Sequence, residues 1–212
     1  MPDAVNIVGL TGGIASGKSA IARTFGTLGI PSLDADQVAR EIVEPGSPAL
    51  EEIRDLFGEA VLQRDGSLDR ALVAELVYRD PLMRRRLETI THPRILARSQ
   101  EKLRALQSSG APYVIYDASL LVETGRYREF VALIVASCRA ATQIQRLKDR
   151  EGLDETRARQ RLAAQLPLEE KLAVADYVIS TEGAKEDLLP QVERVHRALC
   201  ARFGLSSDRG KA

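Results

Sequence analysis

The fold of this chain is decided by eight residues near its start, Gly12-Gly13-Ile14-Ala15-Ser16-Gly17-Lys18-Ser19. They match the pattern G-x-x-x-x-G-K-[ST] in full, the signature of a phosphate-binding loop, or P-loop. The glycines permit tight curvature, so successive N–H groups turn inward around phosphate oxygens at the start of a helix. Lys18 is placed to reach the β- and γ-phosphates, and Ser19 to hold Mg²⁺ through its hydroxyl. The loop is predicted to bind ATP through Gly13, Ile14, Ala15, Ser16, Gly17, Lys18, Ser19 and Ala20.

The segments on either side of the loop fit a strand–loop–helix unit. Residues 5–10 are apolar and β-branched without alternation, which is typical of a strand buried on both faces of a parallel sheet. Residues 19–28 have helical spacing, and Gly29 and Pro31 follow as stop signals. This context favours a true P-loop over a glycine turn that fits the pattern by chance.

Strand signals recur along the chain. Besides 5–10, we predict strands at 30–33, 113–116, 130–136 and 176–179. The predicted fold class is therefore α/β: a P-loop NTPase three-layer sandwich with a parallel five-stranded sheet, a helical insertion and a helical lid.

The insertion and the lid are both predicted from helical spacing. From about residue 37 to 110 the β-branched runs vanish, and helix starts or breaks are expected at Asp80-Pro81 and His92-Pro93. Two basic helices, 142–150 and 154–165, would form a hairpin hinged at Gly152. The predicted organisation is a nucleotide-binding core of residues 1–36 and 111–204, with a lid at about 140–165, an insertion of residues 37–110 and a polar tail of residues 205–212.

The overall composition excludes several classes of protein. Thirty basic and thirty acidic residues cancel, so we expect no nucleic-acid partner and no attraction to an anionic membrane. No uncharged stretch is long enough to span a bilayer. Cys138 and Cys200 are too far apart in sequence to suggest a zinc site or a disulfide framework, which fits a reducing cytoplasm. We expect a cytoplasmic monomer or small homo-oligomer.

Three carboxylates are candidates for chemistry at the carboxyl ends of strands, where open α/β sheets bind ligands. Asp34 and Asp36 follow the second predicted strand, and Asp117 ends the third, where it resembles a Walker B element. We predict that Asp36 is the general base and that Ser19, Asp36 and Asp117 hold Mg²⁺. For each aspartate the alternative is a cap on the turn or helix that follows.

Charged residues elsewhere have both a functional and an ordinary interpretation. Arg146, in the basic hairpin, is predicted to place its guanidinium on the transferring phosphoryl group, which makes Lys18, Asp36 and Arg146 the catalytic set. The alternative for Arg146 is an ion pair on a solvated helix face. Glu123 contacts substrate or is a surface charge, and His92 makes a structural hydrogen bond by default.

Several of these segments together resemble bacterial dephospho-CoA kinases over nearly the whole chain. The resemblance rests on Leu10-Thr11 leading into the P-loop, Leu33-Asp34-Ala35-Asp36 followed by Ala39-Arg40, His92-Pro93, Leu120-Leu121-Val122-Glu123, and Ala175-Asp176-Tyr177-Val178-Ile179. It implies phosphorylation of the ribose 3′-hydroxyl of dephospho-CoA by ATP, an insertion that binds the CoA side, Asp36 as base and Arg146 as a lid arginine on phosphate. It also implies substrate contacts from Asp34, Asp36, Arg40, His92 and Glu123.

The chain departs from the family pattern at two places, and two rival functions remain. Ser119 stands where the family often has proline, and Ser180-Thr181-Glu182-Gly183 replaces an asparagine-containing turn near the adenine. A GTPase is excluded in its standard form because Asn6 is the only asparagine, so the guanine-reading motif is absent. Two rivals stay open: another small-molecule P-loop kinase, with a nucleoside monophosphate or sugar-acid acceptor, and a non-catalytic ATP-binding regulator. A comparison of acceptor alcohols tests the first, and turnover as opposed to binding tests the second.

Overall fold

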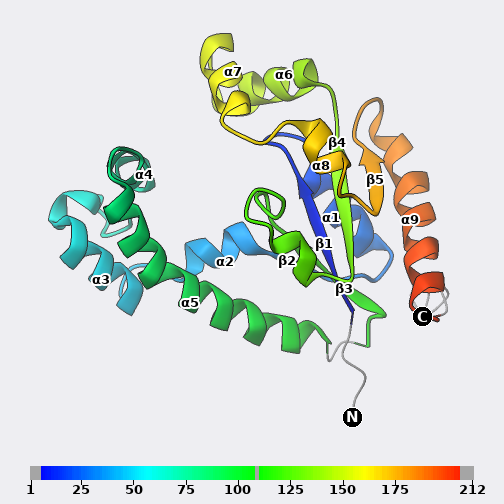
Figure 1. Cartoon of the computed structure of the whole chain (residues 1–212), viewed down its shortest axis with the longest axis horizontal. Coiled ribbons are helices and arrows are strands. Elements are labelled where there is room, and N and C mark those ends of the chain that lie inside the picture. Colours follow the sequence, from blue (N-terminus) through cyan, green and yellow to red (C-terminus); the bar gives the residue numbers. More distant parts are fainter. Residues whose placement is uncertain (1–5, 108–109, 206–212) are drawn as a thin grey trace. The chain divides into compact units, whose positions relative to one another are not determined.

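The computed structural model of the 212-residue chain describes residues 6–107 and 110–205. The contacts within the chain divide it into two compact units. Figure 1 shows the whole chain, coloured from the N-terminus to the C-terminus. Residues 1–34 with 105–212 form what we call the core unit, and residues 35–104 form the inserted unit.

A parallel five-stranded sheet organises the core unit, which confirms the predicted fold class. Its strand order is β2-β3-β1-β4-β5. The strands are β1 Asn6–Gly12, β2 Ser32–Asp34, β3 Tyr113–Asp117, β4 Ala132–Ser137 and β5 Tyr177–Ser180. In the register of the central strand, Leu10 lies beside Asp117 and Gly12 beside Ala136. The carboxyl ends of β3, β1 and β4 therefore meet at the edge where the P-loop begins.

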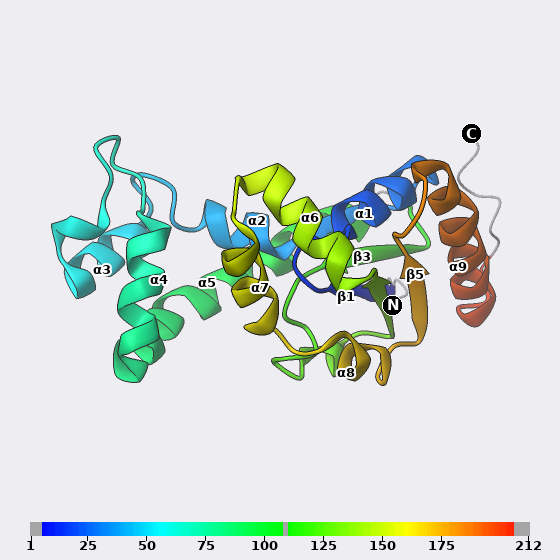
Figure 2. The same ribbon diagram turned by 90° about the horizontal axis from the view of Figure 1, so that it is seen from above.

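Burial on both faces explains why the strands lack alternation. All five residues of β3 are buried, as are Val8 to Gly12 in β1. Helices α1 Lys18–Thr27 and α9 Leu188–Arg202 share one apolar cluster with the strands, and the short helix α8 Leu168–Leu172 lies on the opposite face (Figure 2). Strand β2 begins two residues later than predicted because Pro31 has no N–H to donate, although its carbonyl accepts from Ile115 at 3.0 Å.

The basic hairpin consists of α6 Ala140–Glu151 and α7 Glu155–Ala163. Gly152 ends α6 with a left-handed φ of 64°, and the Asp154 side chain caps α7 by accepting from the Arg157 N–H at 2.8 Å. The hairpin has an apolar cluster of its own, and the P-loop packs against it through Ile14 and Ala15. The hairpin is thus in contact with the phosphate-binding loop, and its role as a lid stays a prediction.

The inserted unit is helical. Its elements are α2 Ala35–Glu41, α3 Pro48–Phe57, the 3-10 turn η1 Glu59–Val61, α4 Arg70–Arg79 and α5 Pro81–Gln107, the last of which runs on past residue 104. A small core holds them together, built from Val43, Ala49, Ile53, Val61 and Val73. The core unit also has the 3-10 turns η2 Arg126–Glu129 and η3 Lys185–Asp187. No helix in the described ranges is both long and apolar enough to cross a bilayer.

The predicted break at His92-Pro93 is wrong, because α5 continues through Pro93 without interruption. A proline removes one donor from the helical ladder, but more than three turns on each side remain to hold the conformation. Beside it, the Arg94 guanidinium donates to the Ile90 carbonyl at 2.6 Å. The start at Pro81 is as predicted, since the Asp80 side chain accepts from the N–H groups of the first turn.

Candidate functional site

The P-loop links the end of β1 to the start of α1, and two of its glycines are required by space. A Cβ at Gly12 would lie 2.8 Å from the Ala136 carbonyl oxygen. A Cβ at Gly17, which has a left-handed φ of 89°, would lie 2.9 Å from the Thr181 side chain. No side chain caps the start of α1, so its first N–H groups are available for an anion.

Lys18 and Asp117 meet at the edge of the sheet. The Lys18 ammonium lies 3.6 Å from a carboxylate oxygen of Asp117, and the two side chains are 14% and 9% exposed. Ser19 is exposed one residue further along α1. In the part of the chain that the structure describes, no three His, Cys, Asp or Glu side chains converge as a metal site. A cation here would need ligands from a bound nucleotide as well.

A cavity of about 530 Å³ opens on this loop. The P-loop residues Ala15 to Ala20 form one wall, and the segment from Ser180 to Leu188 forms another. Five cationic side chains contribute to the lining: Lys18, Arg23, Arg146, Arg150 and Lys185. The size and the positive charge suit a nucleotide with its phosphates.

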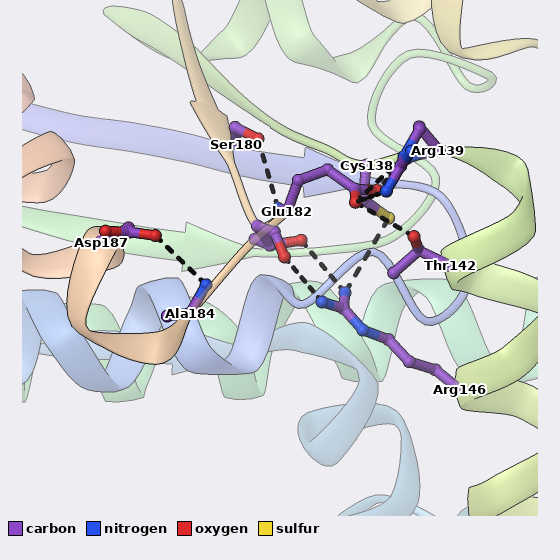
Figure 3. A network of polar contacts seen from close by, with 9 residues as sticks. Cys138, Arg139, Thr142, Arg146, Ser180, Glu182, Ala184 and Asp187 are labelled. Carbon is purple, nitrogen blue, oxygen red and sulfur yellow. Dashed lines mark hydrogen bonds and ion pairs between the residues drawn. The ribbon is translucent and has the colours of Figure 1, made fainter.

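Arg146 points into the P-loop rather than into solvent (Figure 3). Its Nη1 donates to the Ala15 carbonyl at 3.2 Å and to the Thr181 hydroxyl at 3.1 Å, and its Nη2 donates to the Thr181 carbonyl at 2.7 Å. The structure therefore does not support the solvated ion-pair interpretation of this arginine. Contact with a phosphoryl group stays a prediction.

The segment that departs from the family pattern ties the site together. Thr181 donates its hydroxyl to the Ser16 carbonyl at 2.6 Å. The Glu182 carboxylate accepts from the Arg139 backbone N–H at 2.5 Å, from the Arg139 guanidinium and from the Thr142 hydroxyl at 3.1 Å (Figure 3). These bonds, the backbone bond first, lower the pKa of Glu182 to about 2. Glu182 thereby caps the start of α6, where the side chain of the N-cap residue Arg139 makes no capping hydrogen bond.

Two glutamines also hold the loop. Gln143 donates its side-chain amide to the Ile14 carbonyl at 2.7 Å, and Gln165 accepts from the Ile14 N–H at 2.6 Å. Gln143, Gln165, Thr181 and Glu182 are not among the site residues predicted from the sequence. Gln143, Gln165 and Thr181 bond to partners more than a hundred residues away in sequence, and no local pattern assigns these residues to the site.

Glu123 is not a surface charge. Its carboxylate is paired with the ammonium of Lys171 on α8, a side chain that is only 1% exposed. The second carboxylate oxygen of Glu123 is buried and has no hydrogen-bond partner. The pair joins the segment after β3 to α8, and a contact between Glu123 and substrate stays a prediction.

The other predicted acceptor residues are distributed over both units. Asp34 ends β2 and lies beside Asp117 in the register of the sheet. Asp36 and Arg40 are in the first and last turns of α2, and His92 is exposed on α5. Asp36, Arg40 and His92 thus belong to the inserted unit, and their meeting with the P-loop stays a prediction.

Both cysteines are buried. Cys138 is 5% exposed and Cys200 1%, and burial raises the pKa of each thiol. The Cys138 sulfur lies 3.9 Å from Nη1 of Arg146 (Figure 3).

Comparison with known proteins assigns this arrangement to a family. The profile described as dephospho-CoA kinase matches residues 6–187. A dephospho-CoA kinase from Syntrophotalea carbinolica is 47% identical over 88% of each chain. Among solved structures, a protein from Thermus thermophilus aligns with a TM-score of 0.80 at 34% identity, covering 93% of this chain and 97% of that one. A dephospho-CoA kinase from Campylobacter jejuni aligns with a TM-score of 0.67 at 27% identity, covering 93% and 98%. The chain belongs to the dephospho-CoA kinase family.

Proposed function

We propose that this chain transfers the γ-phosphoryl group of ATP to the ribose 3′-hydroxyl of dephospho-CoA, which gives ADP and CoA. The observation that carries the proposal is a complete P-loop whose Lys18 is paired with Asp117, in a chain of the dephospho-CoA kinase family. The cationic cavity beside the loop supports ATP as the donor. A kinase for another small acceptor would share the loop and the cavity but not the family.

Positioning and charge stabilisation are the main tasks in phosphoryl transfer, because the transition state is loose and its charge is spread over the phosphoryl oxygens. Lys18 and Arg146 would balance that charge, and Asp36 would orient the acceptor hydroxyl and take its proton late. Mg²⁺ would be held by Ser19, by Asp36 or Asp117, and by the phosphates, since this ion keeps several non-protein ligands. The hydroxyl of Ser19 and the carboxylate of Asp117 are oxygen ligands of the kind that such a hard cation takes.

The inserted segment of residues 37–110 would bind dephospho-CoA, with contacts from Asp34, Arg40, His92 and Glu123. The hairpin of residues 140–165 would act as the lid over ATP, because its base already contacts the P-loop. A cytoplasmic location and a monomeric or small homo-oligomeric state are further parts of the proposal.

Release of ADP tests the function. The purified chain is assayed with Mg-ATP and dephospho-CoA, or with AMP, gluconate or shikimate, and the product is identified by mass. The variant Asp36→Ala is compared with Asp55→Ala, which removes an exposed carboxylate in the same unit. We expect CoA from dephospho-CoA alone, a large loss in Asp36→Ala and little change in Asp55→Ala. Phosphorylation of another acceptor but not of dephospho-CoA would overturn the assignment of the substrate. No turnover with any acceptor would favour a non-catalytic ATP-binding regulator.

A further inference from the structure

The two peptide groups that flank the Ile14 Cα are each held by a side chain of the lid hairpin. Gln143 comes from the first turns of α6, and Gln165 follows the end of α7. The direction of each bond is fixed by the backbone, because an N–H can only donate and a carbonyl can only accept. Gln143 is therefore the donor, at 2.7 Å, and Gln165 the acceptor, at 2.6 Å. Gln143 is also 7% exposed, so its amide is committed to this contact.

The bond from Gln143 sets the direction of the Ala15 N–H, which is in the same peptide group as the Ile14 carbonyl. All described peptide bonds are trans, and in a trans peptide the carbonyl of one residue and the N–H of the next point opposite ways. With the Ile14 carbonyl turned toward Gln143, the Ala15 N–H must point away from it. The same rule applies at Ser16, whose carbonyl is held by Thr181, so the Gly17 N–H is directed away from Thr181.

The P-loop separates two cavities, which identifies the side that the Ala15 N–H faces. Gln143 and Gln165 line a cavity of about 500 Å³ that Ala15 does not line. Ala15 lines the cavity of about 530 Å³, together with Lys18, and neither glutamine does. The Ala15 N–H is therefore turned toward the phosphate side of the loop.

Ala15 also has the only positive φ of a non-glycine residue in the described ranges, at 55°. An L-residue in the left-handed region is strained and persists only where its surroundings fix it. Here the fixing bonds flank the residue: Gln143 holds the carbonyl before it, and Arg146 holds its own carbonyl at 3.2 Å.

We infer that Gln143 and Gln165 are positioning residues for phosphoryl transfer, because Gln143 fixes the Ile14–Ala15 peptide and so turns the Ala15 N–H toward the nucleotide phosphates, while Gln165 fixes the preceding Gly13–Ile14 peptide. The inference rests on the proposed function, since it takes ATP as the donor. It also couples the lid to the chemistry, because both glutamines are at the base of the hairpin.

The same substitution at the two positions gives opposite expectations. Gln165→Glu keeps an oxygen that accepts from the Ile14 N–H, whereas Gln143→Glu replaces the donor with an oxygen that faces the Ile14 carbonyl. Both variants add one negative charge beside the backbone of Ile14, so the difference between them reports the hydrogen bond. Gln160→Glu, on the exposed face of α7, is the control for added charge on the lid. Gln143→Met removes the donor without charge, in case Gln143→Glu does not fold.

We expect Gln143→Glu to lower kcat at least about 10-fold relative to Gln165→Glu, which is less than the roughly 100-fold cost of removing an oriented donor outright, because the Ala15 N–H is misdirected and not removed. Gln143→Met should fall between the two, the KM for dephospho-CoA should stay within about twofold, and Gln160→Glu should match wild type. A second readout is the Ala15 amide proton in NMR spectra, which should shift on addition of ADP in wild type and not in Gln143→Glu.

Equal kcat values for the two glutamate variants, or an Ala15 resonance that responds to ADP in Gln143→Glu as it does in wild type, would overturn the inference. Failure of the proposed function looks different: wild type itself would not turn over dephospho-CoA, while the amide measurement with ADP would still report on the loop.

Discussion

Removing the ammonium of Lys171 should destabilise the core unit strongly. Its side chain is 1% exposed and pairs with Glu123, which is 19% exposed and whose other carboxylate oxygen has no partner. In Lys171→Met the carboxylate therefore keeps its burial and loses the ammonium with which it pairs. Breaking such a pair from one side costs about 3–5 kcal/mol, and partial access of water to Glu123 places the expected loss near 3 kcal/mol.

That loss can be converted into a melting temperature. An unfolding entropy of about 2.1 cal/mol/K per residue gives roughly 0.45 kcal/mol/K for a chain of 212 residues, so Tm should fall by about 7 °C. Differential scanning calorimetry on wild type, Lys171→Met, Glu123→Met and the double variant measures the effect as a double-mutant cycle. The double variant should recover at least half of the loss, because neither charge is then left buried. A single variant within 2 °C of wild type, or a double variant less stable than both singles, would refute the reasoning.

Three other perturbations have definite signs. The pKa of Glu182 is lowered from 4.5 to about 2, so the stability that its carboxylate gives relative to Glu182→Gln is fully present above pH 4.5 and is lost as the pH falls toward 2. Urea unfolding of wild type and Glu182→Gln at pH 6 and pH 3 checks this. A stability difference between the two proteins that is larger at pH 3 than at pH 6 contradicts it. Gly12→Ala puts a methyl group 2.8 Å from a backbone oxygen and should cost about 1–3 kcal/mol of stability and most of the activity. Gly26→Ala, in open space within α1, should instead stabilise the protein by about 0.5–1 kcal/mol. Changes in Tm of the same sign for the two variants would exclude this account. Pro93→Ala restores a donor inside α5 and should raise the free energy of unfolding by about 1 kcal/mol or more, and a lower Tm would show that Pro93 stabilises the helix.

The sheet and the P-loop were predictable because their signals are local. A buried strand needs only a short apolar run, and the motif from Gly12 to Ser19 is contiguous. The parallel order then placed Asp117 beside the loop, where the structure pairs it with Lys18. The start of strand β2 was predicted two residues too early, because Pro31 accepts a hydrogen bond of the sheet ladder but has no N–H to donate one.

The bonds that shape the loop were not predictable. Gln143, Gln165 and Thr181 bond to P-loop backbone atoms 129, 151 and 165 residues away, and nothing in their own neighbourhood distinguishes them from surface polar residues. Glu123 was similarly ambiguous, because its partner Lys171 is on a five-residue helix with the charge pattern of an exposed segment. Pro93 shows the opposite error: a strong local breaker signal was overridden by the length of the helix around it.

The burial of the two cysteines matters for an enzyme whose acceptor and product both end in a thiol. Thiol–disulfide exchange needs a thiolate that can reach the disulfide sulfur. Cys138 and Cys200 are the only cysteines in the chain, both are nearly inaccessible, and burial raises the pKa of both thiols. When part of the CoA pool is oxidised, the folded protein therefore offers almost no thiolate for a mixed disulfide with its own product, and its resistance to oxidative inactivation lasts as long as the core around these residues stays closed.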